Sequence, residues 1–109
     1  MDVKERIRQT VTGHPVVLFM KGTPDFPQCG FSMSAVQMLN ACGLREFHSV
    51  DVLADADIRQ GIKDYANWPT IPQLYVNGEF VGGADIMREM YQAGELQKLL
   101  GAGAKSTAA

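Results

Sequence analysis

The sequence is poor in cysteine and has no long apolar run. Its 109 residues include 2 cysteines, Cys29 and Cys42, which are too few for a secreted fold held together by disulfides. We therefore expect a reducing compartment, by default the cytoplasm. The longest apolar run, PVVLFM, is far too short to span a bilayer, and the charged N-terminal segment lacks the apolar core of a signal peptide. No membrane association is expected.

An excess of charge of one sign is also missing. The chain has 10 Lys and Arg against 12 Asp and Glu, a formal net charge of −2, and this balance gives no support to nucleic-acid binding. The ending GAGAKSTAA has some residues of a phosphate-binding loop, but alanine precedes its lysine and no strand leads into it. A chain of this length supports a single core. We expect one domain over residues 1–100 and a flexible tail over residues 101–109.

The spacing of apolar residues predicts alternating helices and strands. Up to the middle of the chain we expect a helix ending near Gly13, a buried strand at PVVLFMK, a helix capped by Ser32, a strand at FHSVDV and a helix in DADIRQGIKDYAN. Each strand in this part is separated from the next by a helix. Such strands pair in parallel, with the helices packed on the faces of the sheet.

The second half of the chain closes the sheet with a hairpin. TIPQLYV and EFVGG flank Asn77 and Gly78, the strongest short hairpin signal. Asp85 then opens a last helical stretch, broken around Gly94. The expected fold class is α/β, a thioredoxin-like fold with a mixed sheet of about four strands flanked by helices. Cys29 would follow the first strand, at the mouth of the next helix.

Cys29 is the candidate reactive residue. A helix N-terminus offers unpaired N–H groups and positive potential, both of which favour a thiolate. Cys29 also lies in a Pro/Gly loop near Lys21 rather than on an apolar stripe, so a nucleophile or metal ligand is favoured over a buried apolar cysteine.

Serine at position 32 stands where a second cysteine would complete a Cys-x-x-Cys motif. Without that thiol, a mixed disulfide at Cys29 has no local resolving group. Cys42 would lie roughly 15 Å further along the helix at ~1.5 Å per residue, beyond the Cα separation of about 7 Å that a disulfide tolerates. We expect Cys42 to pack in the core. A redox cycle at Cys29 therefore needs an external thiol.

Charged and backbone groups elsewhere in the chain suggest which thiol this is. Pro72 begins a strand, where a cis bond would leave the backbone of Ile71 free to pair with an extended peptide. Lys21 and Arg59 can receive carboxylates, and Asp85 can receive an ammonium group. A small peptide with a cysteine, an amine and carboxylates matches this set, which points to glutathione.

Three segments, FMKGTPDFPQCGFS, YANWPTIPQLYVNGEFVGGAD and MYQAGEL, resemble the CGFS-type monothiol glutaredoxins in order and spacing. The resemblance extends from about residue 3 to residue 100. It implies a glutathione and cluster site made of Lys21, Cys29, Gly30, Phe31, Arg59, Thr70, Ile71, Pro72, Gly83, Ala84 and Asp85. In the family the lysine and arginine meet the glycine carboxylate of glutathione, and the aspartate and the backbone before it meet the γ-glutamyl end. The family often has cysteine where this chain has Ala84, which speaks against a regulatory disulfide at that position.

The resemblance also implies a cofactor and partners. A [2Fe-2S] cluster takes four ligands, and each chain offers Cys29, so two chains and two glutathione thiolates would complete the set. This implies a homodimer bridged by the cluster, heterodimers with BolA-like proteins, and apo iron-sulfur proteins as recipients. The expected function is a carrier that binds a glutathione-ligated [2Fe-2S] cluster and transfers it to apoproteins in iron-sulfur cluster biogenesis.

Two other functions remain open. The chain could be a glutathione-dependent oxidoreductase that removes glutathione from protein mixed disulfides, because that reaction needs a single protein sulfur; the resemblance implies that this activity is weak. It could also be an interaction module that keeps the fold without the chemistry, which the complete set of site residues disfavours.

Overall fold

The computed structural model describes residues 2–108, with side chains described for residues 2–101. Over these residues the helices are α1 (Val3–Gly13), α2 (Gly30–Ala41), α3 (Ala56–Ala66), α4 (Ala84–Gln92) and α5 (Glu95–Ala108). The strands are β1 (Val16–Met20), β2 (His48–Asp51), β3 (Gln73–Val76) and β4 (Glu79–Gly82). This order agrees with the predicted one, and Gly94, with φ of +77°, separates the last two helices as expected.

The strands form one four-stranded mixed sheet in the order β2-β1-β3-β4. β1 pairs in parallel with β2, while β1 with β3 and β3 with β4 are antiparallel. Asn77 and Gly78 join the last two strands with φ of 53° and 83°, the positive values that a tight hairpin turn requires. The thioredoxin-like α/β architecture predicted from the sequence is therefore confirmed.

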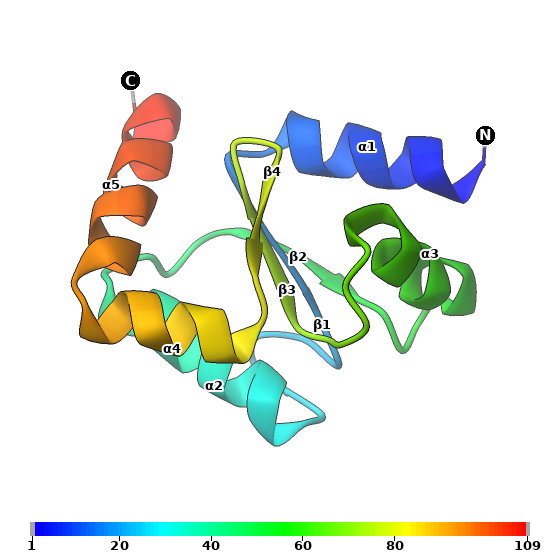
Figure 1. Ribbon diagram of the computed structural model, residues 1–109, viewed down its shortest axis with the longest axis horizontal. Coiled ribbons are helices and arrows are strands. Elements are labelled where there is room, and N and C mark those ends of the chain that lie inside the picture. Colours follow the sequence, from blue (N-terminus) through cyan, green and yellow to red (C-terminus); the bar gives the residue numbers. More distant parts are fainter. Residues whose placement is uncertain (1, 109) are drawn as a thin grey trace.

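Helices cover both faces of the sheet, α1 and α3 on one and α2, α4 and α5 on the other (Figure 1). The side chains of β1 alternate between the two resulting cores. Val17 and Phe19 pack towards α1 and α3, whereas Leu18 and Met20 pack towards the other three helices. Burial on both faces explains why this strand is continuously apolar.

Helix α2 begins three residues earlier than the sequence suggested, because its cap is residue 29 and not residue 32. Cys29, in an extended conformation, is its N-cap residue, and Gly30 is its first residue. The prediction that Ser32 caps this helix is wrong, because the Ser32 hydroxyl is buried and accepts a hydrogen bond from a neighbouring loop instead. The shift places the sulfur directly at the helix end.

The C-terminal part of the chain is helical as far as Ala108. The side chains of residues 102–109 lie outside the described part, so the flexible tail and the domain limit at residue 100 remain predictions. Among residues 2–108 we find no helix with both the length and the apolar character needed to cross a membrane.

Candidate functional site

The candidate site is built around Cys29, which lies between a loop and the N-terminus of α2. The Cys29 side chain makes no capping hydrogen bond to the backbone of its helix, and the thiol is partly exposed. The second cysteine of the chain, Cys42, is the C-cap residue of α2 and packs against the core. The prediction that Cys42 is a packing residue is confirmed, and burial raises the pKa of its thiol.

The surroundings of Cys29 favour its thiolate. Partial burial raises the pKa of the Cys29 thiol, but the backbone N–H groups of Ser32 and Phe31, the Ser32 hydroxyl and the Lys21 ammonium group all lower it. The lowering contributions prevail, so the pKa of Cys29 lies below the ordinary value for cysteine. Cys29 is thus suited to act as a nucleophile or as a metal ligand.

Ser32 connects the sulfur to the preceding loop. Its side chain is fully buried, and its Oγ accepts a hydrogen bond of 3.0 Å from the backbone N–H of Lys21. A hydroxyl can accept and donate at the same time, so the same oxygen can donate its proton towards the Cys29 thiolate. Ser32, which stands where a second cysteine would complete the motif, therefore favours the thiolate of Cys29 and also holds the backbone of Lys21.

We expect Ser32→Ala to raise the pKa of the Cys29 thiol, because the hydroxyl group that lowers it is removed. The rate of alkylation of Cys29 by iodoacetamide should then rise at higher pH than in the wild type and be slower at neutral pH. The control is Ser34→Ala, on the same helix, where the hydroxyl accepts a bond from Arg88 instead. Coincident pH profiles for the Ser32→Ala variant and the wild type would contradict this role.

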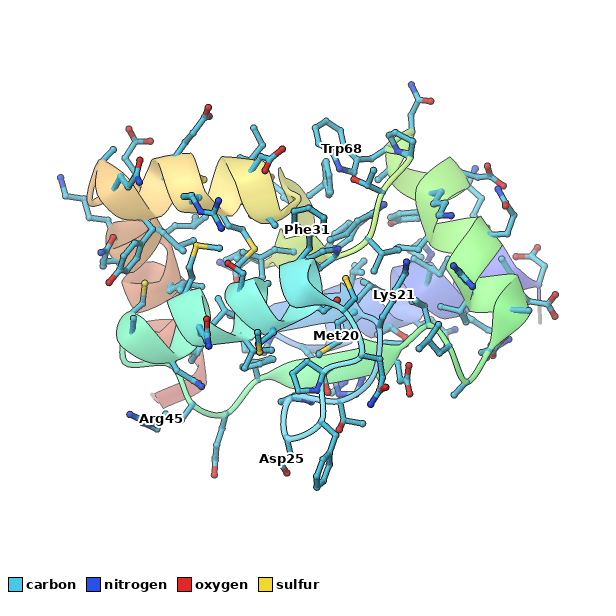
Figure 2. The ribbon with its side chains drawn as sticks, turned by 90° about the horizontal axis from the view of Figure 1, so that it is seen from below. Met20, Lys21, Asp25, Phe31, Arg45 and Trp68 are labelled. Atoms are coloured by element: carbon cyan, nitrogen blue, oxygen red, sulfur yellow. The ribbon has the colours of Figure 1, made fainter. Side chains whose placement is uncertain are left out.

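A cavity of about 340 Å³ opens beside the Cys29 sulfur, within the size range of small-ligand sites. Its walls come from four parts of the chain, namely Lys21, Cys29 and Phe31; Lys63; residues 68–72; and residues 83–85. In Figure 2, Lys21, Phe31 and Trp68 surround the gap between α2 and the segment that leads into β3. The site therefore lies where both helical layers meet one end of the sheet.

Opposite charges enter this cavity from its two sides. Lys21 and Lys63 bring ammonium groups from the end of β1 and from α3, and Asp85 brings a carboxylate from the first turn of α4. Gly83 is the N-cap of α4 and offers no side-chain cap, so the backbone N–H groups of this helix end face the cavity region. A ligand with separate carboxylate and ammonium groups fits such a distribution.

All the predicted site residues line this cavity except Gly30 and Arg59. Sequence reasoning missed Lys63, which follows Arg59 by one helical turn on α3 and so could have been found from its i+4 spacing. The role predicted for Arg59 in ligand binding remains a prediction. The Ile71-Pro72 peptide bond is cis, as expected from the sequence.

Trp68 and Gly83 meet at the edge of the cavity. The indole Nε1 is buried and has no hydrogen-bond partner among the described residues. A Cβ atom at position 83 would lie 3.1 Å from this nitrogen and 3.3 Å from the carbonyl oxygen of Pro72. Glycine therefore permits the close approach of the two segments that form this wall.

A buried glutamine holds the segment that carries Trp68. Gln73 is fully buried, and its Nε2 donates to the carbonyl oxygens of Trp68 and Thr70 at 3.1 and 3.2 Å. Its Oε1 accepts from the Tyr75 hydroxyl at 3.2 Å. The amide thus ties residues 68–70 to strand β3, beneath the cavity.

Replacing Gln73 by methionine, which has a similar length and no donor, should lower the free energy of unfolding by about 2 kcal/mol, because buried polar partners lose their bonds. The Tyr75→Phe control removes only the bond to Oε1 and should cost about 1 kcal/mol or less. Urea unfolding of the three proteins measures this difference. An equal decrease in the free energy of unfolding for both variants would show that the bonds from Gln73 to the carbonyls of Trp68 and Thr70 do not stabilise the fold.

Metal ligands are scarce in the single chain. Within the described residues no group of three or more His, Cys, Asp or Glu side chains is arranged to hold a metal ion. At the cavity the one thiol is that of Cys29. Any iron-sulfur cluster bound here must take its other ligands from outside the chain.

Comparisons with known proteins support a single family. The profile of the family Glutaredoxin matches residues 16–81. The chain is 65% identical over 99 residues to an uncharacterized monothiol glutaredoxin ycf64-like protein of Synechocystis sp., covering 91% of this chain and 92% of the relative. It is 55% identical over 105 residues to glutaredoxin 4 of Escherichia coli, covering 96% and 87%. The solution structure of reduced poplar apo GrxS14 superposes with a TM-score of 0.80 at 51% identity, over 94% of this chain and 93% of that chain.

Proposed function

Because this chain belongs to the monothiol glutaredoxins of the glutaredoxin family, we propose that it carries a glutathione-ligated [2Fe-2S] cluster and transfers it to apoproteins. The observation that carries this proposal is one thiol of lowered pKa at the edge of a cavity with cations on one side and a carboxylate on the other. The cluster is cargo, bound by this protein and then passed to a recipient.

Glutathione matches the cavity group by group. Its glycine carboxylate would meet the ammonium groups of Lys21 and Lys63, and its γ-glutamyl ammonium would meet Asp85. The γ-glutamyl carboxylate would accept N–H groups at the start of α4. The central cysteine would then pass along Ile71, next to Cys29. Each charged group of the tripeptide would thus have a complementary partner, a charged side chain for two of them and the N-terminus of α4 for the third.

The number of ligands that the cluster needs implies a dimer of this chain. A [2Fe-2S] cluster needs four ligands, and Cys29 together with one bound glutathione provides two. A second copy of the chain with its own glutathione would provide the others. Phe31 and Met33 are 61% and 47% exposed beside Cys29, and an apolar surface of this kind would be covered when two copies meet across the cluster.

The same ligand set explains why the cluster would be transferable. Half of its ligands are held only by non-covalent contacts with the protein, so an incoming protein can replace them one at a time. Apo iron-sulfur proteins would be the recipients. A BolA-like protein is the other proposed partner, since its histidine could replace part of the ligand set in a heterodimer.

Anaerobic reconstitution tests the proposal. The reduced protein is mixed with ferrous iron and sulfide, with and without glutathione, and the visible absorption is followed. We expect a coloured species only when glutathione is present, and transfer of the colour to an apo-ferredoxin on mixing. Equal colour without glutathione, or no colour under any condition, would overturn the proposal.

The second candidate is removal of glutathione from protein mixed disulfides, which the partly exposed thiol of lowered pKa favours. The Cys29 thiolate would attack the glutathionyl sulfur and release the protein thiolate. The thiolate of a second glutathione would then attack the new disulfide, release Cys29 and leave as oxidised glutathione. Turnover of a glutathionylated peptide, coupled to glutathione reductase and NADPH, measures this activity. Turnover that exceeds the rate of cluster transfer would make this the main function.

A further inference from the structure

The loop between β1 and α2 is closed on itself. The backbone N–H of Gln28 donates to the carbonyl of Lys21 at 2.9 Å, and Thr23 and Phe26 exchange two backbone hydrogen bonds of 3.3 and 3.0 Å. Gly22 has φ of +88°, and a Cβ atom there would lie 2.5 Å from the carbonyl oxygen of Phe26. These contacts hold residues 21–28 as one unit, which is expected to move as a whole.

Two side chains outside the loop hold its first residues. Ser32 accepts the backbone N–H of Lys21, as described above. Asp51, the last residue of β2, accepts the next N–H in the chain, that of Gly22, through Oδ1 at 2.9 Å. The same oxygen accepts the N–H of Leu53 at 2.9 Å. One carboxylate oxygen therefore ties the loop to the segment that follows β2.

Asp51 itself is not part of the cavity wall. Lys21, whose ammonium group enters the cavity and lowers the pKa of Cys29, is bonded covalently to Gly22. The peptide before Lys21 is held by Ser32 and by the backbone N–H of Val52, which donates to the Met20 carbonyl at 2.9 Å. Among the described residues, the peptide after Lys21 bonds only to Gln28, inside the loop, and to Asp51, so loss of the Gly22 contact would leave this second peptide without a hydrogen bond to the rest of the fold. The loop, closed on itself, would then be free to tilt as a body and carry the ammonium group with it.

We propose that Asp51 is a positioning residue for the cavity, which holds Lys21 in place for the glycine carboxylate of glutathione through the backbone of Gly22. The proposal rests on the proposed function, since glutathione is its ligand. The required property of residue 51 is an acceptor oxygen at the Oδ1 position. Its negative charge is not required, because both bonds come from backbone N–H groups.

Two substitutions of Asp51 separate the effect of its acceptor oxygen from the effect of its charge. Asp51→Ala removes the acceptor and the charge, whereas Asp51→Asn removes the charge and keeps an Oδ1 acceptor. Asp25→Ala is the matched control for charge, because Asp25 lies exposed in the same loop, at the lower edge of Figure 2 and away from Trp68. It removes one carboxylate of the loop without touching Gly22.

The test measures glutathione affinity of the reduced apo protein by NMR titration, with the pH profile of Cys29 alkylation as a second measurement that needs no glutathione. We expect Asp51→Ala to weaken binding about tenfold and to raise the pH at which Cys29 becomes reactive. Asp51→Asn should restore both, and Asp25→Ala should change neither. A merely structural role would lower the unfolding midpoint and leave affinity and alkylation unchanged.

The outcomes separate this inference from the function on which it rests. Wild-type affinity and alkylation in Asp51→Ala would overturn the positioning role, and so would a defect in Asp51→Asn as large as that in Asp51→Ala. If the wild type itself binds no glutathione, the proposed function fails. The alkylation profiles then decide by themselves whether Asp51 positions Lys21 and Cys29.

Discussion

Cys29→Ser is expected to abolish assembly of the cluster. Reconstitution with iron, sulfide and glutathione should give no visible absorption, and the chain should remain a monomer. The reason is that each chain contributes one thiolate at the cavity, and a serine hydroxyl is a poor ligand for iron in such clusters, which are held by thiolates. Glutathione alone would then have to supply the whole ligand set, without a covalent link to the protein.

The second cysteine of the chain provides a matched control. Cys42 is at the other end of α2, packed against the core, and Cys42→Ser should assemble the cluster as the wild type does. Loss of assembly in the Cys42→Ser variant, with an unchanged fold by circular dichroism, would contradict the assignment of Cys29 as the one protein ligand. Full assembly by Cys29→Ser would contradict it as well.

Asp85→Asn is expected to weaken glutathione binding tenfold or more. A factor of ten in affinity corresponds to roughly 1.4 kcal/mol, and the loss of one charge-assisted hydrogen bond costs at least about this much. Asp85 lies in the first turn of α4 and brings the one carboxylate among the residues that line the cavity. The amide keeps the size of the side chain and removes the charge that would meet the γ-glutamyl ammonium group. Calorimetric titration of glutathione into the reduced protein measures the change.

Glu89→Gln serves as the control for this prediction. Glu89 lies one turn further along α4, is exposed, and does not line the cavity. The Glu89→Gln variant should have a glutathione affinity within a factor of about two of that of the wild type, because exposed charges at this distance are screened. If both variants lose the same affinity, the effect comes from the overall charge of the helix and not from contact with the ligand.

The fold could be predicted because its signals are local and strong. The uninterrupted apolar strand β1 must be buried on both faces, and Asn77 with Gly78 leaves a hairpin as the one simple connection. Once parallel strands and a closing hairpin are in place, the number of arrangements is small. The position of Cys29 at a helix end follows from the same reasoning.

The supporting polar contacts could not be predicted, since they join residues far apart in the chain. The hydroxyl of Ser32 is an ordinary helix cap by sequence, and only the fold brings it to the backbone of Lys21. Gln73 stands in an apolar strand, where nothing local shows that its amide reaches back to the carbonyls of Trp68 and Thr70. Such bonds depend on the tertiary approach of two segments, which has no periodic signature.

The direct measurement of the central proposal is the mass of the reconstituted species by native mass spectrometry under anaerobic conditions. We expect a complex of two chains of 11.9 kDa each that contains one [2Fe-2S] cluster and two glutathione molecules, and that separates into monomers when the cluster is lost. A cluster on a single chain, or a dimer that holds the cluster without glutathione, would contradict the proposed ligand set.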